Sequence, residues 1–240
     1  MKEIEITLAG IPLRLGLFFP ENAKGFGSYI SQDNCSGHEI SVDLDEPRRY
    51  PVICPDGVLT PDSEIYLLMP HVSRALLKHG RVLLHGAAFR WRGRAWIFTA
   101  PSGTGKTTQL RNWQQLWPDE LELIGGDKVV LAQEKDGSFW LLPSPWTGKE
   151  GDRGSVSAPL GGIILLRQAE ENTVTRLSPG EAVLRMFDQL LITAETEEEI
   201  VEAAALLDSM LRVVPVWRLD NLGDLDSAYL MRRKLEEDVP

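Results

Sequence analysis

The sequence predicts a mixed α/β fold: a mixed β-sheet with hairpins and flanking helices, preceded by a strand-rich N-terminal extension. Three observations predict it. Apolar and polar residues alternate with a period of two over much of the first 70 residues, which is typical of strands. From residue 81 onward, strand patterns and helix patterns interleave, mostly through hairpins. A glycine-rich segment at 100–108 joins an apolar strand to a helix.

We therefore divide the chain into an extension, 1–80, packed on a core, 81–240. The extension is expected to hold two alternating strands, a Gly/Ser/Asn-rich loop, a third alternating strand, a buried strand and a short helix. These lie in that order at 4–8, 13–17, 20–37, 40–44, 65–69 and 70–79.

In the core, residues 82–89 and 95–99 are expected to pair as a hairpin across Arg92-Gly93, and Asp136-Gly137 predicts a second hairpin turn. Ser178, Thr196 and Asp226 have the side chains of helix N-caps. The expected core strands are 82–89, 95–99, 121–124, 129–133, 139–142, 162–167, 173–177 and 213–219. The expected helices follow residue 105, ending before Pro118, and cover 179–191, 197–211 and a segment after Asp226. Residues 143–159 are expected to form a Pro/Gly-rich loop.

Composition excludes several classes of protein. Of 240 residues, 43% are hydrophobic and 25% charged, as in a soluble globular protein. The net charge of −10 argues against broad nucleic-acid binding, which needs Lys and Arg to replace phosphate counterions. It does not exclude a small anionic ligand, because local dipoles and one or two cations can outweigh it.

Targeting signals and cysteine chemistry point to the cytoplasm. The N-terminus lacks the apolar run of a signal peptide, and no window approaches the ~18 apolar residues of a membrane span. Cys35 and Cys54 lack metal-ligand spacing and a disulfide framework, so we expect reduced thiols. We predict a cytoplasmic protein without a membrane partner.

The strongest local motif is a phosphate-binding loop. Gly103 and Gly105 allow the backbone to turn its N–H groups toward phosphate oxygens, and the following helix adds its positive N-terminal end. Lys106 can bridge the β- and γ-phosphates, and Thr107 can place its hydroxyl on Mg²⁺. The predicted nucleotide-binding residues are Ser102, Gly103, Thr104, Gly105, Lys106, Thr107 and Thr108. Ala100 stands where the Walker A pattern has its first glycine. The alternative is a glycine-rich turn with a surface lysine.

The segments around this loop resemble the catalytic domain of HPr kinase/phosphorylase and its uncharacterised bacterial relatives. The resemblance runs from about residue 84 to residue 219. It rests on His85-Gly86-Ala87-Ala88, the loop itself, Gly125-Gly126-Asp127-Lys128, Ser144-Pro145-Trp146-Thr147-Gly148-Lys149-Glu150 and Ala158–Leu166. It implies the nucleotide-binding core shared with ATP-dependent phosphoenolpyruvate carboxykinase, and therefore ATP and Mg²⁺ as cofactors and an oligomeric assembly.

The resemblance also implies site residues, with one departure. In the HPr kinases, the motif that corresponds to Gly125-Gly126-Asp127-Lys128 has two adjacent aspartates, and the first is the base toward the substrate hydroxyl. Here Gly126 stands at that position and only Asp127 is kept, as a Mg²⁺ ligand directly or through water. His85 would face the nucleotide and orient the acceptor or take its proton. The extension does not resemble the N-terminal domain of the long HPr kinases, so HPr is not the implied substrate.

Each further candidate has a structural alternative. Glu150 could bind metal or act as base, and Lys149 could neutralise the moving phosphoryl group, or both are a solvated pair in a turn. Trp146 could stack on a ligand or pack in the core. Arg153 is a weaker candidate for phosphate contact. Asp127 could be a turn aspartate, and His85 a hydrogen-bonded core histidine.

Three functions remain open from the sequence. The leading prediction is an ATP- and Mg²⁺-dependent kinase that transfers the γ-phosphoryl group to a hydroxyl of a small protein, a peptide or a small molecule, for example a serine. The missing acid at Gly126 favours a second: a non-catalytic ATP-binding regulatory module of the same fold. The third, a carboxykinase-type enzyme, is disfavoured because 240 residues leave little room for a large organic-acid domain.

Overall fold

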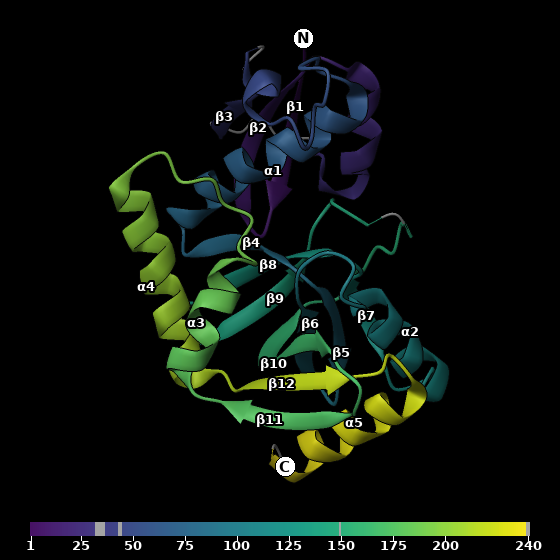
Figure 1. Cartoon of the computed structure of the whole chain (residues 1–240). Helices are drawn as coiled ribbons and strands as arrows, with labels where there is room; N and C mark the ends of the chain where they lie inside the picture. The colour runs from purple at the N-terminus through teal and green to yellow at the C-terminus, as the bar shows by residue number, and fades with distance from the viewer. Residues whose placement is uncertain (32–36, 43–44, 149, 239–240) are drawn as a thin grey trace.

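The computed structural model describes residues 1–31, 37–42, 45–148 and 150–238. In these residues the chain has a mixed α/β fold (Figure 1). The N-terminal part lies at the end of the molecule opposite the C-terminus, above the larger sheet in the view of Figure 1. It contains a three-stranded sheet of β1 (Lys2–Leu8), β2 (Ile11–Leu17) and β3 (His38–Ser41), together with 3-10 segments η1 (Pro20–Tyr29) and η2 (Glu46–Arg49).

The expected strand at 65–69 is wrong. These residues belong to helix α1 (Pro61–Leu77), which also contains the expected short helix. The helix begins earlier because Thr60 and Ser63 form a reciprocal capping box, with Pro61 in the first turn. Pro70 lies inside the helix and does not end it. The run of apolar residues that suggested a strand instead supplies the buried face of this helix.

Helix α1 ties the N-terminal part to the larger sheet. The carboxylate of Glu64 is fully buried and accepts hydrogen bonds from Phe18 N–H at 2.6 Å and Asn22 Nδ2 at 2.7 Å. On the other side, the buried Ser73 hydroxyl accepts the N–H of Leu83, on an edge strand, at 3.0 Å. The apolar cluster under the N-terminal sheet also includes Leu83, Val130 and Trp146 of the core.

Among the described residues, nine strands form the larger sheet. Its main order is β4-β8-β9-β10-β6-β5-β7, and β12 pairs with both β10 and β11. Strands β6, β10 and β12 are parallel, so their carboxyl ends meet at one edge. The strands are β4 (Arg81–His85), β5 (Ala87–Trp91), β6 (Arg94–Thr99), β7 (Glu122–Gly125), β8 (Lys128–Gln133), β9 (Phe139–Pro143), β10 (Ala158–Gln168), β11 (Thr173–Leu177) and β12 (Val216–Asn221).

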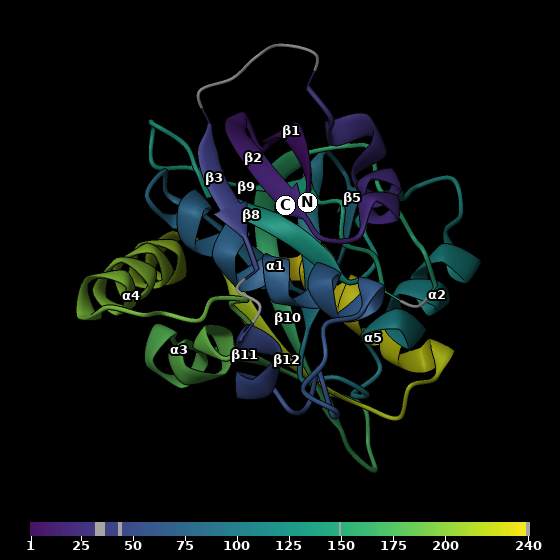
Figure 2. The same ribbon diagram turned by 90° about the horizontal axis from the view of Figure 1, so that it is seen from above.

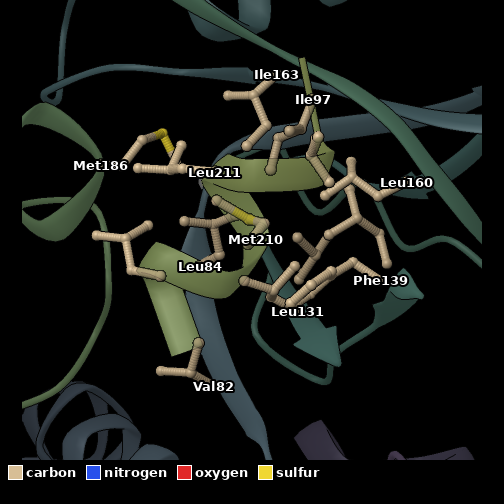
Figure 3. Close-up of a cluster of buried hydrophobic side chains, with 14 of the residues drawn as sticks. Val82, Leu84, Ile97, Leu131, Phe139, Leu160, Ile163, Met186, Met210 and Leu211 are labelled. Carbon is tan, nitrogen blue, oxygen red and sulfur yellow. The ribbon is translucent and has the colours of Figure 1, made fainter. Parts of the chain in front are cut away.

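Helices cover both faces of the sheet (Figure 2). On one face, α3 (Pro179–Phe187) and α4 (Glu197–Val213) pack on an apolar cluster that includes Val82, Ile97 and Met210 (Figure 3). On the other, α2 (Lys106–Leu116) and α5 (Leu225–Asp238) cover a cluster rich in aromatic rings. Trp91, Trp96 and Trp113 are buried in that cluster.

The expected strand at 82–89 is interrupted at Gly86. Strand β4 pairs with β8, whereas β5 pairs with β6 across the expected turn at Arg92-Gly93. A Cβ on Gly86 would lie 2.5 Å from the Ile97 Cδ1 atom and 2.8 Å from the Phe98 carbonyl, so only glycine fits where the chain changes partners. One apolar run therefore supplies strands to two different parts of the sheet.

Other elements differ from the expectation mainly at their ends. Part of the loop expected at 20–37 is the 3-10 segment η1. Residues 32–36 of the expected loop and Leu44 of the expected third strand lie outside the described residues. Helix α4 continues through Val213, so β12 begins three residues later than expected. The cap of α5 is Asp224, whose carboxylate accepts the Ser227 N–H at 2.9 Å, and not Asp226. Within the described ranges, none of the helices has the length and apolar character needed to cross a membrane.

Candidate functional site

The glycine-rich loop follows β6 at the edge where the three parallel strands end. Gly103 has φ +80° and Gly105 has φ +106°, conformations that favour glycine, and α2 begins directly after them at Lys106. Ala100 does not have a positive φ, so the methyl group that departs from the Walker A pattern introduces no backbone strain. The loop thus has the strand, the left-handed glycines and the helix start that its motif predicts.

The side chain of Lys106 folds back over its own loop. Its ammonium donates to the carbonyl oxygens of Ala100 at 2.8 Å and Pro101 at 3.2 Å, and the residue is 7% exposed. Burial lowers the pKa of Lys106, and the negative charge of Asp127 acts in the opposite direction. The alternative of a surface lysine is therefore wrong for Lys106.

Three side chains form an ionic cluster beside the loop: Asp127, His85 and Lys128. Asp127 follows β7, and its Oδ1 lies 3.2 Å from His85 Nε2 while its Oδ2 accepts from the Lys128 ammonium. Burial raises the pKa of Asp127, but the hydrogen bonds from His85 and Lys128 outweigh it, and the pKa lies well below its usual range. Asp127 is therefore ionised and held by a partner on each oxygen.

His85 does not lie on a strand next to the loop strand, contrary to expectation, because β4 pairs with β8. It reaches the loop strand in another way. The buried Thr99 hydroxyl, at the end of β6, donates to the His85 carbonyl at 2.6 Å. The His85 N–H donates to the backbone carbonyl of Gln189, and the Gly86 N–H donates to the backbone carbonyl of Asp127. These contacts fix His85 between β6 and Asp127.

The loop at 143–159 approaches this cluster, but its predicted residues have different surroundings. Trp146 is 4% exposed, and its indole donates to the Ile65 carbonyl at 3.1 Å, so it packs against the N-terminal part. Glu150 is exposed and has no hydrogen bond or ion pair to any described residue. Lys149 lies outside the described residues. A Cβ on Gly148 would be 3.0 Å from the Asp127 Cβ, so the loop backbone passes directly over Asp127.

Asp152 of this loop occupies the space beside Gly126. The Gly126 N–H donates to the Asp152 carbonyl at 3.2 Å. A Cβ on Gly126 would lie 2.6 Å from the Asp152 Cβ and 3.4 Å from its carboxylate Oδ2. That carboxylate pairs with Arg111 of α2 at 2.7 Å. The position without a side chain is therefore filled by an acid from elsewhere in the chain.

The other loop residues have mostly local partners. The Thr104 hydroxyl donates to the Pro101 carbonyl, and Gln168, at the end of β10, donates to the Gly103 carbonyl at 3.4 Å. Ser102 and Thr108 are exposed, and Thr107 is half-buried. Thr107 makes no hydrogen bond through its side chain with any described residue.

Sequence reasoning missed the groups that hold α2 in place. The buried Gln109 amide donates to the Asn221 side chain at 3.1 Å and to the Ser227 hydroxyl at 2.6 Å. Asn112 donates to the carbonyls of Gly223 and Asp224. A polar residue inside an apolar helix face is the signal that could have identified Gln109. The partners of Lys128 and Asp152 have no comparable local signal.

A resident metal centre has no support in the described part of the chain, where no three His, Cys, Asp or Glu residues gather as ligands. Magnesium that arrives with a nucleotide needs fewer protein ligands, because phosphates and water supply most of its coordination. The Thr107 hydroxyl and the Asp127 carboxylate are oxygen groups of the kind that Mg²⁺ binds. Direct contact with Asp127 requires the metal to displace Lys128 or His85 from the carboxylate.

Of the two cysteines, Cys54 is a buried free thiol and Cys35 lies outside the described residues.

Comparisons with known proteins find similarity to solved structures alone. No family model matches the chain, and no curated protein matches it. Among solved structures, the chain is similar to the Hpr(Ser) kinase/phosphatase from Coxiella burnetii at 14% sequence identity and a TM-score of 0.38, over 65% of this chain and 97% of that one. Values this low assign no activity, and the function has to follow from the residues of this chain.

Proposed function

We propose that this protein is an ATP- and Mg²⁺-dependent phosphotransferase that moves the γ-phosphoryl group to a hydroxyl. One observation carries the proposal: the glycine-rich loop holds the Lys106 ammonium in a residue only 7% exposed, close enough to the half-buried Asp127 carboxylate for its charge to oppose the effect of burial on the pKa of Lys106. Phosphoryl transfer asks a protein mainly for this kind of positioned charge, because the chemistry needs little covalent help.

The phosphate loop binds the donor in this proposal. The backbone N–H groups of 102–107 surround the β- and γ-phosphates, and the start of α2 adds its positive end. The Lys106 ammonium leaves the carbonyls of Ala100 and Pro101 and bridges the two phosphates. Magnesium bound with ATP would neutralise charge on the β- and γ-oxygens, with the Thr107 hydroxyl and Asp127 holding it directly or through water.

His85 is the acceptor's proton partner in this proposal. The acceptor oxygen forms a bond to the γ-phosphorus, the bond to the β-bridging oxygen breaks, and its electron pair leaves with ADP. The acceptor proton passes to His85, and the Asp127 carboxylate 3.2 Å away stabilises the resulting imidazolium. This role does not need the aspartate that Gly126 replaces. Glu150, in the loop between β9 and β10, remains an alternative base.

The first test is nucleotide binding. Lys106→Ala should weaken binding of a fluorescent ATP analogue roughly 100-fold, because a charge-assisted contact to phosphate is lost. Lys135→Ala, in the exposed turn between β8 and β9, is the control and should bind as the unchanged protein does. Normal nucleotide binding by Lys106→Ala would contradict the site.

A second candidate function, a non-catalytic ATP-binding module of the same fold, is favoured by a specific observation. Both oxygens of Asp127 already have protein partners, and position 126 has no side chain. A module of this kind would bind ATP and consume it slowly without an acceptor. Incubation of the protein with γ-labelled ATP, Mg²⁺ and cell extract separates the two: a labelled acceptor supports the transferase, and its absence together with slow hydrolysis supports the module.

A further inference from the structure

A groove of about 510 Å³ separates the N-terminal part from the core loop at 143–159. Its N-terminal wall is formed by residues of η1 and α1, and its core wall by Lys128, Pro145, Trp146, Thr147 and Arg153. These segments are far apart in the sequence, so the groove exists only in the folded chain. Grooves at the junction of two parts of a molecule are frequent ligand sites.

The two walls of the groove carry opposite charges. Glu21 and Asp62 lie on the N-terminal wall, and Arg153 and Lys128 lie on the core wall. Neither acid forms an ion pair or hydrogen bond through its side chain with any described residue, and the same is true of the Arg153 guanidinium. Burial raises the pKa of Tyr29 in η1, and the charge of Arg153 lowers it in part, so Arg153 lies near the N-terminal part. Unpaired charges of both signs thus line one cavity.

Apolar side chains from both walls also line the groove. Ile65, Met69 and Trp146 line the groove, and the Tyr66 side chain is exposed beside them. Trp146 is fixed by its hydrogen bond to the Ile65 carbonyl and by an edge contact with Phe26, whose ring centroid is 5.8 Å away. A surface that combines apolar, acidic and basic groups suits a segment with several different side chains better than a singly charged metabolite.

The groove leads to the ionic cluster. Lys128 lines it, lies 5.9 Å from the centre of the Tyr66 ring, and contacts the Asp127 carboxylate with the same ammonium. Next to Arg153, Asp152 fills the space at Gly126, one residue from Asp127. A ligand in the groove is therefore delivered to the side chains that would receive a phosphoryl acceptor.

We propose that this groove is the acceptor site and takes a polypeptide segment that carries a hydroxyl beside basic residues. Glu21 and Asp62 would hold the basic side chains, and the hydroxyl would point past Lys128 toward His85 and Asp127. The net charge of −10 also attracts a basic partner, as Glu21 and Asp62 do in the groove. The proposal rests on the proposed phosphotransferase for its chemistry, but the binding of such a segment is tested without it.

The experiment compares two fluorescent serine octapeptides, one with two arginines and one with two glutamates at the same places. Binding is measured by anisotropy at low ionic strength. The arginine peptide should bind more tightly, and the double variant Glu21→Gln/Asp62→Asn should bind it roughly five-fold more weakly, as expected from two exposed charge pairs. Glu171→Gln, an exposed acid in the turn between β10 and β11, is the matched control and should bind normally.

Several outcomes would overturn the acceptor groove: equal binding of the two peptides, no binding of either, or unchanged affinity in the double variant. Nucleotide binding by the same samples separates this result from the proposed function. If ATP binds and the arginine peptide does not, the groove is wrong and the phosphate site remains. If the peptide binds as predicted and Lys106→Ala leaves ATP binding unchanged, the groove remains and the phosphotransferase is wrong. Circular dichroism confirms that each variant is folded.

Discussion

The phosphate loop and the ionic cluster of Asp127, His85 and Lys128 lie close together but are built in different ways. The loop is a continuous segment whose glycine torsions and helix start lie within a few residues of one another. The cluster brings the end of β4 to the turn between β7 and β8, about 40 residues away in the sequence. The difference teaches that a site made of backbone can be predicted from its sequence, whereas a site made of side-chain contacts depends on strand pairing.

Electrostatics connects the two regions. Asp127 acts on Lys106 through space, and Thr99 joins the loop strand to the backbone of His85. Changes in one region should therefore affect the other only through charge and position. The following predictions separate the two regions, starting with the largest expected effect.

Asp127→Asn should remove the function of the cluster and leave the loop intact. We expect phosphoryl transfer to fall about 100-fold, the size of effect seen when a group that supports a metal is lost, while ATP affinity stays within a few-fold. Steady-state transfer and nucleotide titration measure the two quantities. Asp119→Asn, at an exposed turn, is the control. Full transfer activity in Asp127→Asn would show that the cluster is structural.

Gly126→Asp restores an acid at the second motif, yet it should destabilise the protein. A Cβ there would meet the Asp152 Cβ at 2.6 Å, and overpacking of this kind costs about 1–3 kcal/mol. Urea unfolding should show a lower midpoint for this variant and recovery of most of the loss in Gly126→Asp/Asp152→Gly. Gly126→Ala separates the added atom from the added charge. An unchanged midpoint in Gly126→Asp would mean that Asp152 moves away without loss.

The smallest expected effect concerns acid stability. The folded pKa of Asp127 is lowered, so its carboxylate contributes stability that is fully present above the unfolded pKa of about 3.9. That contribution decreases as the pH falls below the unfolded value and is lost once the pH passes through the lower folded pKa. Asp127→Asn should therefore lose less unfolding free energy than the unchanged protein between pH 5 and pH 3. Urea unfolding of both proteins at each of these pH values measures the difference. Parallel pH curves would contradict this.

Much of the fold follows from local patterns. Strand β11 has the bounds that were expected, and β8 and β9 form the hairpin predicted from Asp136-Gly137. The capping side chains of Ser178 and Thr196 place the starts of α3 and α4. The failures occur where local and tertiary signals differ. Residues 65–69 read as a strand because their apolar run is equally compatible with the buried face of a helix.

The site divides in the same way. The sequence predicted a glycine-rich turn between a strand and a helix, and the structure has that turn. The roles predicted for His85 and Asp127 stay predictions. The sequence could not identify the neighbour of β4, the position of Trp146 in the core, or the place of Asp152 beside Gly126. Each of these depends on which distant segments pack together, and local propensity does not contain that information.

The sequence by itself determined the shape of the glycine-rich loop, because left-handed glycines and a helix start depend on interactions within a few residues. It also determined that the protein is acidic overall, so that positive potential is local. Only the tertiary structure decided that Asp127 has a partner on each oxygen, and that the N-terminal part faces the core across a charged groove. The physical reason is that side-chain ion pairs and cavities form between segments that the folded chain alone brings together.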